Sequence, residues 1–314
     1  MAEPVALVAL VALALDAGLG WPARLHAVTG HPVGAFARLI ATCERRWNRP
    51  GLSDFARRLL GTVTVALLIA VAALGALAVE HAIRWAAGPL AWPLLALAAW
   101  PALAQRSLDD HVRPVIAALA RDDLPAARKA VGRIVGRDTA ALDQAGIARA
   151  AIESLAESFC DGVVAPLFWL LVLGLPGAWA YKAVNTADSL IGHPEPPLRA
   201  FGWAAARSDD LLNLAPARLS ALLLCLAGGG GWRIVWRDHA RHASPNAGWP
   251  EAAMAGVLRV RLAGPVRYDG AVLDKPWIGE GGEAGLAVLV AARRVYVRAC
   301  GLGWLIAGGM AWLA

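Results

Sequence analysis

The chain alternates between long apolar windows and polar segments. The apolar windows lie at about 1–20, 59–79, 89–104, 163–181, 211–227 and 301–314. The clearest of them, at 59–79, contains no charged residue and has the roughly 20 apolar residues that a bilayer-spanning helix needs. The first window has no basic residues before its apolar stretch and contains Asp16, so we expect a retained helix rather than a cleaved signal peptide.

Two of these windows are interrupted. The sequence Gly174-Leu-Pro-Gly177 breaks the window at 163–181 and predicts a turn. Non-helical backbone at membrane depth is tolerated only where it is buried in protein or lines a cavity, so we expect a hairpin that returns to its own side of the membrane. The window at 211–227 is broken in a similar way by Asn213, Pro216 and Arg218. That window is therefore not expected to be a plain span.

The polar segment 105–162 is rich in alanine and arginine at amphipathic spacing, which predicts helices outside the membrane. Pro125 follows Asp122 and Asp123 and suits the first turn of one of them. No strand-rich region, internal repeat or low-complexity tract is visible. The predicted fold class is all-α: one polytopic membrane-embedded domain over 1–314, with four to six membrane-embedded helical segments, a cytoplasmic helical segment at 105–162 and a cytoplasmic loop and helix segment at 232–300.

Composition supports a membrane location, because 58% of the residues are hydrophobic and only 17% are charged. The net charge of +6 resides in the polar segments: Lys and Arg number seven in 21–58, eight in 105–162 and ten in 232–300, but one in 80–88. The positive-inside rule therefore places the three basic segments in the cytoplasm. This pattern accounts for the charge without a nucleic-acid partner, and none is expected. The four cysteines stand far apart and predict neither a zinc site nor disulfides.

Three carboxylates, Glu153, Glu157 and Asp161, stand at i, i+4 and i+8 and would form one stripe of a helix. Two interpretations are open. The stripe is either a solvated face or, because it adjoins a membrane-embedded hairpin, a functional wall. Magnesium ligation is the natural function in the second case, since this ion takes carboxylate oxygens and keeps waters for a substrate phosphate.

A second acidic motif comprises Asp209 and Asp210, followed by Asn213 and Arg218. An aspartate pair before an apolar run is also a helix N-terminal signal, which explains the acids but not the later Asn213 and Arg218. Tyr181, Asn185 and Asp188 are expected on one helix face after the hairpin. Lys182 either contacts a phosphate or extends to the membrane interface.

Two polar loops complete the candidate chemistry. Ser244 to Glu251 holds two prolines, a glycine, Asn246 and Trp249 before an Ala-rich helix, a density that favours a binding loop over a simple cap, with Pro250 at the first helical position. Arg137 and Asp138 lie in a glycine-containing loop that fails as a Walker motif but can clamp a phosphate. His239 and His242 are three apart in an arginine-rich loop, and we expect them to be surface residues.

These and other short motifs occur in a specific order along almost the whole chain. They are Leu15-Asp16, His31-Pro32, Gly136-Arg-Asp-Thr139, Glu153-Ser-x-Ala-Glu-x-x-x-Asp161-Gly-Val-Val-Ala-Pro166, Tyr181-Lys-Ala-Val-Asn-Thr-x-Asp-Ser-x-Ile-Gly192, Phe201-Gly with Ala206-Arg-x-Asp-Asp210, Pro216-Ala-Arg-Leu219 and Ser244-Pro-Asn-Ala-Gly-Trp-Pro-Glu-Ala-Ala-Met-Ala-Gly256. In this order and spacing the chain resembles the integral-membrane cobinamide-phosphate synthase family of cobalamin biosynthesis, known as CbiB and CobD.

The resemblance implies a carbon-nitrogen ligase that joins the free propionate of adenosylcobyric acid to (R)-1-aminopropan-2-ol or its phosphate. ATP would be the co-substrate and an acyl phosphate the expected intermediate, with Mg²⁺ neutralising the phosphates and a base taking a proton from the amine. The implied partners are the corrinoid, the amine, the lipid bilayer and other late cobalamin-pathway membrane enzymes. The implied location is the bacterial inner membrane, multi-pass, with the active site facing the cytoplasm.

On this basis each candidate residue receives an expected role. Catalysis is assigned to Glu153, Glu157 and Asp161; metal binding to Asp209 and Asp210; ATP or phosphate binding to Arg137, Asp138, Lys182 and Arg207; and substrate binding to Asn185, Asp188, Asn213, Arg218, Ser244, Asn246, Trp249 and Glu251. Two other classes stay open, a membrane transporter and a non-catalytic membrane sensor. A transporter would be expected to show paired repeats in two halves, and none is visible.

Overall fold

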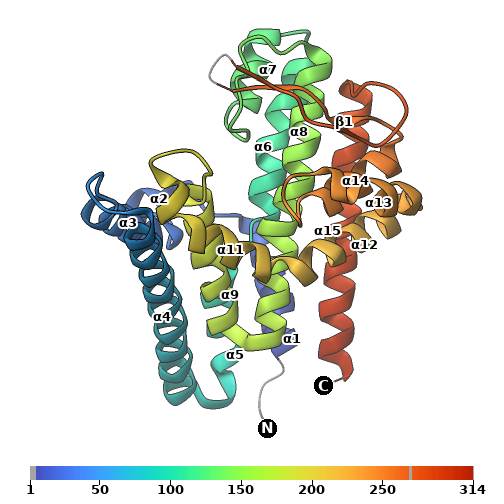
Figure 1. Cartoon of the computed structure of the whole chain (residues 1–314). Coiled ribbons are helices and arrows are strands. Elements are labelled where there is room, and N and C mark those ends of the chain that lie inside the picture. The colour runs from blue at the N-terminus through green and yellow to red at the C-terminus, as the bar shows by residue number, and fades with distance from the viewer. Residues whose placement is uncertain (1–4, 269–270, 314) are drawn as a thin grey trace. The chain divides into compact units, whose positions relative to one another are not determined.

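The structure, a computed structural model, describes residues 5–268 and 271–313. The chain divides into two compact units. Unit 1 comprises 1–104, 165–213 and 307–314, and unit 2 comprises 105–164 and 214–306. Both are mainly helical, as Figure 1 shows.

Unit 1 is built mainly from helices of its first two chain segments. Their bounds are α1 Val5–Leu19, α2 Ala23–Thr29, α3 Val33–Trp47, α4 Asp54–Ala87, α5 Ala91–Ala99, α9 Ala165–Ile191, α10 Leu198–Phe201 and α11 Trp203–Leu212, with 3-10 turns η1 Gly88–Leu90 and η2 Trp100–Ala102. The Ser53 hydroxyl accepts the backbone N–H of Ala56 at 3.2 Å and so caps α4. The core lies where Leu68 and Ala72 of α4 pack against Ala183 and Val184 of α9.

Gly61 sets how closely α10 approaches α4. A β-carbon at this position would collide with the backbone carbonyl of Phe201. Phe201 is fully buried in the same core. A glycine is therefore required here by close packing of the two backbones.

The predicted interruption of the fourth apolar window is confirmed. Within α9 the backbone leaves helical geometry at Gly174, with φ of 67° and ψ of −159°, and Pro176 follows in the next turn. Figure 1 shows the chain turning within α9. Only glycine adopts such a backbone conformation readily, which is why the break falls at this residue. Which side of a membrane each limb would face stays a prediction.

Unit 2 holds the remaining helices and four short strands. The bounds are α6 Gln105–Leu119, α7 Leu124–Val131, α8 Gln144–Phe159, the π-helix η3 Cys160–Val164, α12 Leu214–Gly228, α13 Trp232–Asp238, the 3-10 turn η4 His239–Arg241, α14 Gly248–Leu258, β1 Leu262–Ala263, β2 Val266–Tyr268, β3 Ala271–Leu273, β4 Trp277–Ile278 and α15 Leu286–Leu313. The last residues of α15 fall in unit 1. The helices predicted within 105–162 are confirmed, and Pro125 lies in the first turn of α7 as expected.

The core of unit 2 is formed by α8, α14, α12 and the first part of α15. Ile152 of α8 and Met254 of α14 are fully buried in it. Phe159 packs edge-on against Tyr296 of α15 with ring centroids 5.7 Å apart, and the Tyr296 hydroxyl donates to the carbonyl of Gln105 at 2.7 Å. The many alanines at these contacts allow the helices to pack closely.

Most of the residues that the structure describes are helical, as the all-α prediction requires, but four short strands among them were missed. β1 pairs with β4 antiparallel, with Leu262 opposite Ile278 and Ala263 opposite Trp277, and β2 pairs antiparallel with β3. Each strand has two or three residues. An alternating pattern cannot be recognised over so few positions, which explains the omission.

The helix that carries the predicted carboxylate stripe is not regular throughout. Cys160–Val164 forms a π-helix, in which each turn contains more residues than an α-helical turn. Glu153 and Glu157 lie in α8, whereas Asp161 lies in this π-helix. The functional role of the stripe stays a prediction.

Several helices are long and apolar enough to cross a membrane. Among the described residues there are two such helical runs, Asp54–Leu119 and Gln144–Ile191. The number rises to four if two bent pairs, α1 with α2 and α11 with α12, each count as one span. The first pair is bent by 104°. These findings support a helical membrane protein with two to four candidate spans.

Candidate functional site

Unit 2 contains a polar cavity of about 150 Å³, here called the glutamate pocket. It is bounded by α8, by the loop after α7, by α14 and by the strand region. Its polar lining consists of Arg137, Glu153, Ser154, Glu157, His242, Glu251 and Lys275. Four of these residues, Arg137, Glu153, Glu157 and Glu251, were predicted from the sequence as site residues.

Glu153 is the structural centre of this pocket. It is 8% exposed and lies in α8, whose start is fixed by Asp143, because that carboxylate accepts the backbone N–H of Gly146 at 2.7 Å. One Glu153 oxygen pairs with the guanidinium of Arg137, and the other accepts the backbone N–H of Ala263 at 2.7 Å. Both oxygens are thus engaged. The ion pair and the hydrogen bond tie the 132–143 loop and β1 to α8.

Glu251 has a different environment in the same pocket. Its side chain lies in the first turn of α14 and is 4% exposed. Oε1 is 3.7 Å from Nε2 of His242, while Oε2 is buried and makes no hydrogen bond with any residue that the structure describes. Burial, reinforced by the nearby carboxylates of Glu153 and Glu157, raises the pKa of Glu251 well above its ordinary value. The protonated form of this carboxyl is therefore favoured.

His242 faces Glu251 and is not the surface residue that the sequence suggested. Its Nδ1 accepts the backbone N–H of Ser244 at 3.0 Å, so the neutral ring carries its proton on Nε2, the atom nearest Glu251. Burial, together with the charge of Lys275, lowers the pKa of His242. The imidazole is thus neutral at pH 7. The only sequence signal was its place two residues before the Ser244 loop.

The remaining residues of the predicted binding loop shape the loop rather than line the glutamate pocket. The Ser244 hydroxyl accepts the backbone N–H groups of Asn246 and Ala247, each at 3.2 Å. Asn246 Oδ1 accepts a hydrogen bond from Arg218 at 2.9 Å, and that guanidinium lies 4.6 Å from the ring centroid of Trp249. α14 begins at Gly248, so Pro250 lies within the first turn rather than at its first position.

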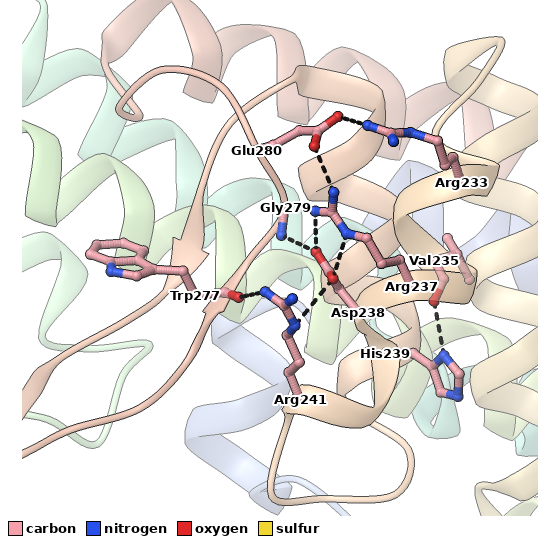
Figure 2. Close-up of polar contacts among 9 residues, drawn as sticks. All are labelled: Arg233, Val235, Arg237, Asp238, His239, Arg241, Trp277, Gly279 and Glu280. Carbon is pink, nitrogen blue, oxygen red and sulfur yellow. Dashed lines mark hydrogen bonds and ion pairs between the residues drawn. The ribbon is translucent and has the colours of Figure 1, made fainter.

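The strand end at Trp277 is held by a network of charged side chains, shown in Figure 2. Asp238 is fully buried and accepts two hydrogen bonds from Arg237, at 2.8 and 2.7 Å, and one from the backbone N–H of Gly279 at 2.8 Å. Arg241 lies 3.2 Å from Asp238 and donates to the carbonyl of Trp277 at 3.0 Å. The pKa of Asp238 is lowered mainly by the hydrogen bonds that it accepts from Arg237.

A second group of predicted residues comes together in unit 1, between α9 and α11, and is here called the Asp209 cluster. Asp209 accepts the side-chain amide of Asn213 on Oδ2 at 2.9 Å and that of Asn185 on Oδ1 at 3.3 Å. Tyr181 donates its hydroxyl proton to Asn213 Oδ1 at 3.1 Å. Asp210 pairs with Arg207 of the same helix at 3.1 Å. Asp209 and Asn213, which were placed in one motif from the sequence, are therefore in direct contact.

The other predicted residues lie outside the lining of the glutamate pocket. Asp138 is exposed in the loop after α7, and Asp161 is half-buried in the π-helix. Lys182 and Asp188 are half-buried on α9 in unit 1. Within the described ranges no group of three or more His, Cys, Asp or Glu side chains has the arrangement of a metal site. All four cysteines are buried, and within the described ranges none of them forms a disulfide.

The fold and the pocket define a mainly helical protein with helices able to cross a membrane and a polar, glutamate-lined cavity. The chain belongs to the CobD/CbiB protein family, whose model matches residues 9–295. The resemblance inferred from the motifs is thereby confirmed.

Similar proteins span nearly the same length. The chain is 50% identical over 275 residues to the cobalamin biosynthesis protein CobD of Rhodobacter capsulatus, covering 86% of this chain and 85% of that protein. It is 45% identical over 315 residues to the protein of the same name from Rhizobium meliloti (strain 1021), covering 96% and 95%. A Sinorhizobium sp protein of this name is 47% identical over 294 residues, covering 90% of each chain. No solved structure matches the chain.

Proposed function

We propose that this protein acts in cobalamin biosynthesis as a carbon-nitrogen ligase. It would join the free propionate of adenosylcobyric acid to (R)-1-aminopropan-2-ol or its phosphate, at the expense of ATP, to give adenosylcobinamide or its phosphate. Family membership supports the pathway, since the similar proteins carry the name cobalamin biosynthesis protein CobD. The buried, unsatisfied carboxyl of Glu251 supports the chemistry.

Amide formation requires a free amine, and the glutamate pocket is suited to produce one. In water an alkylamine is protonated and cannot attack a carbonyl carbon. Burial disfavours charged forms, so it raises the pKa of a carboxyl and lowers that of an ammonium group. A proton therefore passes more readily from a bound ammonium to Glu251 than it would between the same groups in water. The product of this transfer is a neutral amine beside a neutral acid.

The neighbouring residues assist this step. The unpaired oxygen of Glu251 accepts the proton, and the neutral ring of His242 lies beside the other oxygen, with Nε2 3.7 Å from Oε1. Glu157 also lines the pocket and supplies a second carboxylate that attracts the cation. Glu153 is engaged by Arg137 and Ala263 and is assigned a positioning role. Glu251, which was assigned to substrate binding from the sequence, thus takes the base role in this proposal.

The carboxylate partner must be activated before the amine attacks. One propionate oxygen attacks the γ-phosphorus of ATP, ADP leaves, and an acyl phosphate forms. The amine nitrogen then attacks the carbonyl carbon and the C–O bond to phosphate breaks. Of the two protons that the ammonium loses, one goes to Glu251 and one leaves on the phosphate. Atoms and charges balance without an oxidant or reductant.

Magnesium is the implied metal, and the Asp209 cluster fits it. Each Asp209 oxygen accepts one amide hydrogen bond and keeps a lone pair, and Asp210 stands next to it. Mg²⁺ in nucleotide enzymes is commonly held by one or two carboxylates, waters and substrate phosphates, so a larger cluster is not required. Asp209 and Asp210 would hold the ion. When bound, it would neutralise phosphate charge.

A product assay tests the proposal. The full chain, purified in detergent, is incubated with ATP, Mg²⁺ and adenosylcobyric acid, with and without 1-aminopropan-2-ol or its phosphate, and ADP and the corrinoid amide are quantified. ADP release that depends on both corrinoid and amine supports the ligase. Absence of the amide under all conditions overturns it. Corrinoid uptake into sealed vesicles without the amide would point to a transporter, and corrinoid binding without uptake to a sensor.

A further inference from the structure

Unit 2 contains a second polar cavity, of about 190 Å³. It is lined by Arg149 of α8, by Arg261 and Trp277 of the strand region, and by Asp143 and Glu283. The guanidinium carbons of Arg149 and Arg261 lie 4.9 and 5.1 Å from the ring centroid of Trp277. Two cations therefore share one indole, which keeps both of them at the cavity.

The positive charge of Arg149 is poorly compensated. Its side chain is 19% exposed, and its Nε is buried without a hydrogen-bond partner among the described residues. The nearest carboxylate oxygen is Glu153 Oε1, at 3.8 Å, beyond hydrogen-bonding distance. That oxygen already accepts the N–H of Ala263, and the other one pairs with Arg137. A buried charge in this condition carries a desolvation cost that a ligand of opposite charge would offset.

The two acidic residues of the cavity do not supply that compensation. Asp143 is exposed, and its side chain is already engaged as the cap of α8. Glu283 is also exposed, so water screens its charge. The group that lacks a partner is thus a guanidinium, whose planar set of donors matches phosphate oxygens.

We infer that this cavity, here called the Arg149–Arg261 cavity, binds a phosphate group through Arg149 and Arg261. The phosphate group that suits the proposed ligase is the polyphosphate of a nucleotide. Only this choice of ligand rests on the proposed function. Trp277 positions the two arginines, and the hydrogen bond from Arg241 to its carbonyl fixes Trp277 in turn, as Figure 2 shows. Neither Arg149 nor Arg261 was among the phosphate contacts predicted from the sequence.

The two cavities share α8. Arg149 lines the Arg149–Arg261 cavity and Glu153, one turn later, lines the glutamate pocket. A phosphate that pairs with Arg149 would weaken its attraction to Glu153 and leave that carboxylate to Arg137 and Ala263. A phosphate in the Arg149–Arg261 cavity would therefore change the electrostatic potential at Glu251 in the glutamate pocket.

The test is a binding measurement that requires no turnover. Inorganic tripolyphosphate is titrated calorimetrically into the detergent-purified full chain and into three variants. Arg261→Gln and Arg149→Gln should each weaken binding by about tenfold or more, because each removes charge-assisted hydrogen bonds. Arg259→Gln is the matched control: Arg259 is an exposed arginine two residues from Arg261 that does not line the cavity, so its loss should leave affinity unchanged.

Arg261 is exposed and makes no ion pair with any residue that the structure describes. Arg261→Gln therefore keeps the test valid even if Arg149→Gln is unstable. Competition then identifies the source of the phosphate: ATP, 1-aminopropan-2-yl phosphate, or phosphatidylglycerol in nanodiscs. Competition by any one of them supports the inference. No binding in the wild type, no competition by any of the three, or equal weakening in all three variants overturns it.

The failures of the two proposals are distinguishable. If tripolyphosphate binding depends on Arg149 and Arg261 but no amide forms in the product assay, the proposed function fails and the phosphate site stands. If the amide forms but binding is insensitive to both arginines, the ligase stands and this site is wrong.

Discussion

Nε2 of His242 lies 3.7 Å from Oε1 of Glu251, and it is the protonated nitrogen of a neutral imidazole. The contact places a neutral ring, rather than a cation, beside a carboxyl group whose pKa is raised by burial. The positive charges of Lys275 and Arg137 act in the opposite direction, but more weakly than burial and the carboxylates of Glu153 and Glu157. The predictions below begin from this arrangement.

Glu251→Gln should lower the rate of single-turnover amide formation by about 100-fold or more, because the amide cannot accept a proton. Stability should be unchanged or slightly higher, since glutamine has the shape of the protonated acid that burial already favours. Rapid-quench measurement at saturating ATP and corrinoid, with a thermal-unfolding control, checks both effects. The exposed Glu195→Gln is the matched variant and should behave like the wild type. Wild-type turnover in Glu251→Gln would exclude this residue as the base.

Glu251 should also make stability depend on pH. Its folded-state pKa is raised, so its contribution to the free energy of unfolding is fully present below the ordinary glutamate pKa of 4.5. That contribution is lost as the pH rises from 4.5 through the folded-state pKa. The thermal midpoint of the wild type should fall relative to that of Glu251→Gln as pH increases over this window. Midpoints measured across a pH series in one detergent provide the check. Parallel curves for the two proteins would contradict the raised pKa.

Arg137 and Glu153 should be strongly coupled. Their side chains are 7% and 11% exposed, and removing one partner leaves a buried charge, at a cost of about 3–5 kcal/mol. The double variant Arg137→Gln/Glu153→Gln should be less destabilised than the sum of the single variants by about 1–3 kcal/mol. The measurement is a double-mutant cycle: the free energies of unfolding of the wild type, the two single variants and the double variant are determined in mixed micelles. Simple additivity would show that the ion pair does not hold the 132–143 loop.

The adjacent aspartates of the Asp209 cluster should respond differently to the same substitution. Asp209→Asn replaces an acceptor of two amide hydrogen bonds with a group that is partly a donor, so it should lower the thermal midpoint as well as activity. Asp210→Asn loses one pairing with Arg207, which is 63% exposed, so the protein should stay stable. Its magnesium-dependent turnover should nevertheless be abolished. Normal turnover of Asp210→Asn over a magnesium titration would remove Asp210 from the metal site.

Much of the helical architecture could be predicted from local patterns. The break at Gly174 follows from a glycine and a proline within one turn, and the start of α7 follows from Asp123 and Pro125. The four strands and the π-helix at 160–164 could not be foreseen. The strands are too short to show a period, and the π-helical turn depends on how the helix packs rather than on any residue in it.

The candidate site was predictable in its residues but not in their pairings. Arg137 was expected to hold a phosphate, yet it pairs with Glu153, because a buried carboxylate on α8 competes for the same guanidinium. The loop that carries Glu251 was recognised by its polar density, whereas His242 beside it was taken for a surface residue. Contacts between residues distant in sequence decide both outcomes, and no spacing rule encodes them.

In the proposed reaction, the unsatisfied oxygen of Glu251 would give the glutamate pocket the properties of a weak-acid ion exchanger. Each turnover would leave one proton on this carboxyl, and His242 could not remove it at Nε2, which already carries its own proton. The next ammonium to enter would favour the ionised carboxylate and expel the stored proton to water. Amine binding should then release protons stoichiometrically below the folded-state pKa, so that calorimetric binding enthalpies vary with the ionisation enthalpy of the buffer.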